Sequence, residues 1–179
     1  MNEIIKKNGI NFGIILGVLG IVSHTIVYLM GGITKENAII GSVIQFVFWL
    51  AYLILRLYQC TTTKKQVGFV TLKDLFTTLT ITVTIGIVIS QLFAFLLNNY
   101  IDPVYGSSMN EFINSQQVEA MKAMKGFMDV SKKDLKEVAN VDNFSAMVFL
   151  KGTFFSILVS SVMNIILAAI FKSKTQENY

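Results

Sequence analysis

Charged residues are scarce in this chain of 179 residues: Asp, Glu, Lys and Arg make up only 15% of it, against roughly 25% in soluble domains. Four stretches carry no charge at all, residues 8–34, 37–55, 75–101 and 152–171. Each can cross a hydrocarbon core of about 30 Å as a helix that rises about 1.5 Å per residue. The distribution excludes a disordered or disulfide-stapled chain and predicts an integral membrane protein.

Cysteine, histidine and proline each occur once. The lone Cys60 cannot form an intramolecular disulfide. One histidine and one cysteine are also too few ligands for a typical metal site and give little support to a catalytic Cys–His pair. The chain also lacks an HExxH motif and a glycine-rich phosphate loop after a strand. Its proline, Pro103, lies outside the uncharged stretches. None of these stretches therefore has the proline-broken helix that is typical of transporters. We therefore expect no enzymatic activity, no catalytic residues, no metal site and no cofactor.

The expected fold is an all-α membrane bundle of four helices in a single domain, residues 1–179. The predicted spans are about residues 9–31, 38–58, 75–101 and 146–171, and residues 102–150 form a loop outside the bilayer. In the third span, threonines alternate with aliphatic residues from Thr78 to Ile85, a period typical of a strand in water. A lone strand leaves its backbone unsatisfied in lipid, however, so we predict a helix here as well.

The positive charges indicate how the spans are oriented, because loops rich in Lys and Arg stay in the cytoplasm. One side of the predicted membrane carries eight of them: Lys6, Lys7, Arg56, Lys64, Lys65, Lys73, Lys172 and Lys174. The other side has only Lys35 and Lys151 close to span ends. Both termini are therefore expected in the cytoplasm, with Arg56 snorkelling to the inner headgroups. Because these cations flank the spans, the net charge of +4 does not indicate nucleic-acid binding.

Small residues form a stripe on the first predicted helix. Gly9, Gly13, Gly17 and Gly20 are spaced four, four and three residues apart, and His24 follows four residues later. Such stripes let membrane helices approach closely where lipid leaves no hydrophobic force to bring them together. The other three spans each carry a similar seam of small or polar residues, as a four-helix bundle needs.

Polar side chains in the spans agree in depth. His24, Gln45, Gln91 and Ser160 each lie about 10 to 12 Å below the outer span ends at about 1.5 Å per residue, with Asn164 somewhat deeper. We expect them to form one hydrogen-bonded layer. The layer is either structural, at about 0.6 kcal/mol per contact, or a site for a proton, ion or small ligand with His24 as its titratable member.

The outer loop shows helical spacing. Apolar residues repeat every three or four positions from about Ser108 to Phe127, and Ser131 with Asp134 resembles a capping box for a second helix that ends near Ala139. We expect these amphipathic helices to cap the bundle or lie on the outer leaflet. Alternatively, they present a methionine-rich docking face made of Met109, Met121, Met124 and Met128.

Four segments together resemble a known family. They are the glycine-rich stretch from Gly9 to Gly20, Gly68-Phe69-Val70-Thr71-Leu72-Lys73-Asp74, Asp102-Pro103-Val104-Tyr105, and Ile165-Ile166-Leu167-Ala168-Ala169-Ile170-Phe171-Lys172. The chain is similar to the small four-span bacterial inner-membrane proteins known only as a domain of unknown function. The resemblance implies a bacterial inner membrane and four spans, and it carries over no functional residue.

Two functions fit these patterns. The first is a non-enzymatic membrane protein that contacts lipids and either self-associates or accompanies a membrane-protein partner. The second is a small channel or carrier, formed by an oligomer around the layer of His24, Gln45, Gln91, Ser160 and Asn164. The two differ in oligomeric state and in whether a wet lumen lies between protomers.

A reporter enzyme that is active only outside the cytoplasm tests the predicted orientation. Fused after Tyr179 it should be inactive, whereas inserted within residues 102–150 it should be active, because the lysines hold the termini inside. Activity of the fusion after Tyr179 would contradict the predicted orientation.

Overall fold

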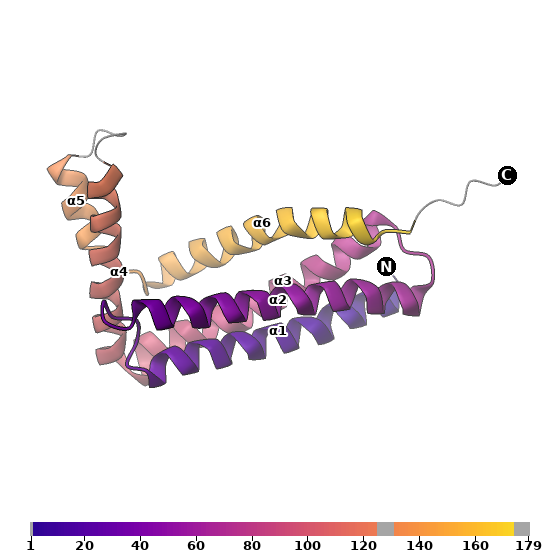
Figure 1. The fold of residues 1–179 in the computed structure, drawn as a ribbon, viewed down its shortest axis with the longest axis horizontal. Helices are drawn as coiled ribbons and strands as arrows, with labels where there is room; N and C mark the ends of the chain where they lie inside the picture. Colours follow the sequence, from indigo (N-terminus) through magenta and orange to yellow (C-terminus); the bar gives the residue numbers. More distant parts are fainter. Residues whose placement is uncertain (1, 125–130, 174–179) are drawn as a thin grey trace.

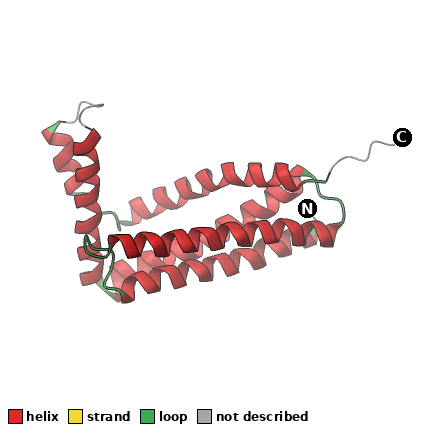
Figure 2. Cartoon of the chain, in the orientation of Figure 1, coloured by secondary structure: helices red, strands yellow, loops and turns green. Residues whose placement is uncertain are grey.

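The computed structural model describes residues 2–124 and 131–173, and over these ranges it contains helices and no strand. Four long helical segments run side by side along one axis (Figures 1 and 2). They are α1 (Glu3–Leu29), α2 (Ala38–Val67), α3 (Leu72–Leu96) continued by a π-helical turn, η1 (Leu97–Ile101), and α6 (Ala146–Phe171). All four are long and apolar enough to cross a membrane, so the expected all-α, four-span fold is confirmed.

Two of the helices, α2 and α6, are longer than the uncharged stretches that predicted them. The largest extension is in α2, which continues to Val67 rather than ending near residue 58. Gly68, at φ +81°, then ends the helix, because its backbone lies in the left-handed region that favours glycine. Arg56, which the sequence placed at the end of its span, therefore stands well inside α2.

The glycine stripe of α1 packs on α3. A Cβ added at Gly9, Gly13 or Gly17 would lie 2.7 to 2.8 Å from the Cβ of Ile81, Ile85 or Ile89, respectively. These distances are shorter than carbon atoms tolerate, so only glycine lets the two backbones approach this closely. The glycine stripe of α1 thus forms a contact within the chain, with α3.

The end of the bundle where α1 begins and α6 ends, here named the terminal end, has a polar core (Figure 1). The Asn8 amide of α1 donates to Thr63 Oγ1 at 3.2 Å and to Gln66 Oε1 at 2.8 Å, both on α2. Gln59 of α2 donates to Thr82 of α3, whose hydroxyl lies 3.0 Å from the Gly9 carbonyl. These buried bonds connect three helices where apolar contacts with lipid would compete equally well.

The threonine-rich span is helical, as predicted. Thr71 and Asp74 form a capping box at its start. Further along, the Thr78 hydroxyl donates to the Asp74 carbonyl at 2.9 Å, and the Thr82 hydroxyl donates to the Thr78 carbonyl at 3.0 Å. Returning each hydroxyl to the preceding turn gives it an acceptor within its own helix.

Two helices lie across the opposite end, here named the cap end (Figure 1). The first, α4 (Pro103–Ala123), starts five residues before the predicted Ser108, because Asp102 caps it and Pro103 occupies its first turn. Its predicted end at Phe127 and the methionine Met128 lie outside the described residues. The second, α5 (Lys132–Ala139), begins at the predicted capping box of Ser131 and Asp134, which confirms that expectation.

The cap is attached to the bundle by polar contacts. The Tyr28 hydroxyl of α1 donates to Asp102 Oδ2 at 3.1 Å, and the Tyr28 and Tyr105 rings meet edge to face at 4.9 Å. Burial raises the pKa of the Tyr105 phenol, and the neighbouring Tyr28 and Asp102 raise it further. At the exposed rim, Lys35 donates to Glu119 at 2.8 Å, which lowers the pKa of that carboxyl. The loop after α1 and the cap therefore hold each other in place.

Replacing Gly13 by leucine should separate α1 from α3. The added side chain meets the Ile85 Cβ and the Thr82 carbonyl, neither of which can move without the backbone. Overpacking of this kind costs about 1 to 3 kcal/mol of unfolding free energy. Gly152→Leu on α6 is the matched control, because a Cβ there meets nothing within 4 Å. Unfolding of both variants in detergent, followed by circular dichroism, should show a loss for Gly13→Leu only. Equal stability of the two variants would contradict the close contact between α1 and α3.

Candidate intramembrane ligand site

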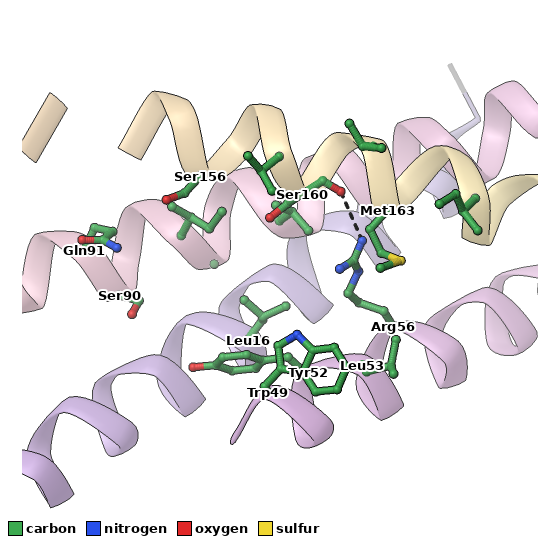
Figure 3. A pocket seen from close by; sticks show the side chains of 16 residues that line it. Leu16, Trp49, Tyr52, Leu53, Arg56, Ser90, Gln91, Ser156, Ser160 and Met163 are labelled. Carbon is green, nitrogen blue, oxygen red and sulfur yellow. Dashed lines mark hydrogen bonds between the residues drawn. The ribbon is translucent and has the colours of Figure 1, made fainter. Parts of the chain in front are cut away.

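A cavity of about 630 Å³ lies between α2, α3 and α6 (Figure 3). It forms because α6 packs mainly on α3 and makes few contacts with α2. Most of its lining is apolar. The polar or charged lining residues are Tyr52, Arg56, Ser90, Gln91, Ser156 and Ser160. The site is therefore an apolar recess in the membrane region with a small number of polar groups.

Arg56 is the one charged residue that lines this cavity. It stands eight residues before Lys64 on α2, which places it about 12 Å from the lysines of the terminal end at about 1.5 Å per residue. On α6, its partner Asn164 stands eight residues before Lys172, which gives the same depth of about 12 Å. With these lysines at the membrane surface, this depth lies within a hydrocarbon core of about 30 Å.

The Arg56 guanidinium points across to α6. Its Nη2 donates to Asn164 Oδ1 and to the Ser160 carbonyl at 3.4 Å, and Figure 3 shows the side chain reaching toward Ser160. Asn164 is fully buried and its amide also lies 3.4 Å from Thr80 Oγ1 of α3. A single asparagine thus links the arginine of α2 to the threonine of α3.

The positive charge of Arg56 has no acidic counterpart in the site. The two ion pairs found over residues 2–124 and 131–173 are Lys35–Glu119 and Lys133–Glu137, both in the cap or beside it. The Arg56 Nε–H is buried and makes no hydrogen bond. Because guanidinium stays protonated, the cavity wall keeps a positive charge. A residue of this kind inside a membrane marks a functional site more often than a structural one.

The structure divides the predicted polar layer. Gln91 and Ser160 both line the cavity, and Asn164 is buried beside it on Arg56. His24 is half-buried on α1 and Gln45 is exposed on α2, and neither lines the cavity. No hydrogen bond joins any two of these five described residues, so the single hydrogen-bonded layer is not formed. Counting depth from span ends placed them at one level but could not show which way each helix face turns.

Arg56 is the site residue that the sequence reasoning misplaced. It was assigned to the headgroups because an uncharged stretch ends at residue 55. A clue was nevertheless present, because Arg56 is the only charge between residues 37 and 63. A helix that continues to Lys64 and Lys65 has better anchors for the membrane surface, and this leaves Arg56 inside.

The residues that line the cavity include no His, Cys, Asp or Glu. Over the described ranges no three His, Cys, Asp or Glu side chains come together in a group that could hold a metal ion. Cys60 is buried at the terminal end, in the apolar core formed with Leu75, Leu79 and Leu167. The chemistry that the cavity offers is recognition: an apolar surface, hydroxyl and amide groups, and one cation.

The four spans and the recess between them define a multi-pass membrane protein with a helical-bundle fold. Residues 11–173 match the family described as "Protein of unknown function (DUF4199)", and the chain belongs to this family. No curated protein and no solved structure matches the chain. The family description assigns no activity, so function has to be argued from the geometry of the site.

A double-mutant cycle tests the contact between Arg56 and Asn164. Asn164→Leu removes an acceptor from a half-buried cation, and Arg56→Met leaves a buried amide oxygen without its donor. Each single change should cost about 1 to 3 kcal/mol of unfolding free energy. The double variant should lose clearly less than the sum, because both polar groups leave together.

Denaturant unfolding of the purified protein in detergent measures all three variants. Ser161→Ala is the control on the same helix, because its hydroxyl donates only to the Ile157 carbonyl one turn earlier. Simple additivity of the two single losses would show that Arg56 and Asn164 do not interact.

Proposed function

We propose that this protein is a non-enzymatic protein of the bacterial cytoplasmic membrane that binds an apolar or amphiphilic molecule from the bilayer in the cavity between α2, α3 and α6. Both termini are proposed to lie in the cytoplasm, on the side of the lysines at the terminal end. The observation that carries the proposal is the cavity itself, apolar in most of its lining and open beside a single arginine.

The size and lining of the cavity support ligand binding. Its volume of about 630 Å³ falls within the range of about 300 to 1,000 Å³ that small-molecule sites occupy. Such sites are mostly apolar and use a small number of polar groups to orient the ligand. Tyr52, Ser90 and Gln91 supply those groups at one end of the cavity, and Arg56 supplies the charge at the other (Figure 3).

This geometry favours binding within one chain over the oligomeric channel or carrier that the sequence left open. The expected pore required a lumen between protomers, around His24 and the other layer residues. The cavity instead belongs to one chain, and His24 does not line it. A ligand can therefore be held by a monomer, without assembly of a channel.

Self-association or association with a membrane partner stays a prediction. The glycine stripe of α1 is occupied by α3, so it does not provide the contact. The surfaces of α2 and α6 are open to a second chain, because Phe46, Trp49 and Phe155 are more than half exposed there. Lipid covers such surfaces equally well.

Fluorescence of Trp49 provides a direct test of ligand binding. Trp49 lines the cavity and is the only tryptophan in the chain. The protein is placed in phosphatidylcholine nanodiscs and titrated with 12-bromododecanol, a neutral amphiphile whose bromine quenches tryptophan. We expect saturable quenching on top of the linear quenching by probe dissolved in the lipid.

Two variants of α6 separate binding from general contact with lipid. Ser160→Phe fills the cavity and should abolish the saturable component, because Ser160 lines it. Ile165→Phe adds the same ring at a half-exposed position outside the lining and should leave saturation unchanged. Purely linear quenching in the unmodified protein, or saturation that survives Ser160→Phe, would overturn the proposal.

A further inference from the structure

We infer that the cavity selects an amphiphile with one apolar chain and an acidic headgroup, and that Arg56 binds the acidic group. The inference rests on the proposed function, because it names the ligand class of the same cavity. It adds the sign of the ligand's charge, the residue that reads it and the number of its chains.

The charge of the site indicates the charge of the ligand. A buried cation is costly unless an anion or several acceptors compensate it. Arg56 has two neutral acceptors, Asn164 Oδ1 and the Ser160 carbonyl, and its buried Nε–H has none. No carboxylate of the described residues lines the cavity. An anionic oxygen brought by the ligand would pair the charge of the guanidinium, as guanidinium groups commonly bind carboxylates and phosphates.

The depth of Arg56 indicates a small headgroup on a single chain. The guanidinium lies about 12 Å from the lysines of the terminal end, so the acidic group must leave the membrane surface to meet it. A compact carboxylate makes this move with less loss of hydration than the large headgroup of a phospholipid, which is bound to two chains. We therefore assign the site to an alkyl carboxylate rather than to an anionic phospholipid.

The lining of the cavity matches a chain that extends from this headgroup. Away from Arg56 the wall is formed by aliphatic and aromatic residues, among them Trp49, Val83 and Val159. Tyr52 and Gln91 lie further toward the cap end (Figure 3). A carboxylate at Arg56 thus directs its alkyl chain along an apolar wall and past Trp49, which reports its presence.

The test compares three brominated ligands with the Trp49 assay in phosphatidylcholine nanodiscs. They are 12-bromododecanoate, the neutral 12-bromododecanol, and a phosphatidylglycerol brominated on its chains. We expect saturable quenching by the carboxylate with a dissociation constant about 10-fold lower than that of the alcohol, as a charge-assisted hydrogen bond implies. The brominated phosphatidylglycerol should quench without saturating.

Variants of Arg56 show which residue reads the charge. In Arg56→Met the carboxylate should bind no better than the alcohol, so the preference of about 10-fold is lost. Arg56→Lys should retain part of the preference, because it keeps the charge but not the planar fork of donors. If Arg56→Met fails to fold, the double variant Arg56→Met/Asn164→Leu replaces it, because it leaves neither a buried cation nor an unpaired amide.

The results test separately the acidic headgroup, the single chain and the binding function itself. Equal affinity for carboxylate and alcohol in the unmodified protein overturns the assignment of an acidic ligand but leaves the binding function standing. Saturation by brominated phosphatidylglycerol overturns the assignment of a single chain. Absence of saturable quenching by every ligand overturns the proposed function itself.

Discussion

The close contact between α1 and α3 is the interaction on which the rest of the structure depends. Lipid chains compete equally for apolar surface, so membrane helices need unusually close packing to stay together. The glycines of α1 provide it by leaving room for the branched Ile81, Ile85 and Ile89 of α3. With α1 on one side and α6 on another, α3 becomes the centre of the bundle, and α2 is joined to it at the terminal end by polar bonds and by the apolar core around Cys60.

The cavity is a consequence of this unequal packing. Because α6 packs along α3 and makes few contacts with α2, a space lies between these helices that no side chain of the described residues fills. Arg56 and Asn164 form the main polar link between α2 and α6 at the edge of that space. A bundle built for stability alone would place an apolar residue at position 56, since a buried cation gains little stability even when it is paired. The retained charge therefore argues for a ligand.

The sequence predicted the number of spans, their helical nature and the start of α5, because charge-free length and capping residues act locally. It did not predict where the site lies. Gly152, Ser156 and Ser160 share one seam on α6, yet a Cβ added at Gly152 would meet nothing within 4 Å, and the two serines line the cavity. His24 and Gln45 do not line the site. Position along a helix is readable from spacing, whereas rotation about the helix axis depends on partners that only the folded bundle reveals.

Native mass spectrometry of the protein released from its own membrane tests the central claim most directly, because it reports what occupies the cavity in the cell. The account predicts that the unmodified protein and Ile165→Phe retain one bound molecule with the mass of a single-chain carboxylic acid. Ser160→Phe and Arg56→Met should lose it. A protein that emerges bare from the membrane, or an identical bound mass in all four proteins, would contradict the assignment of the cavity to such a ligand.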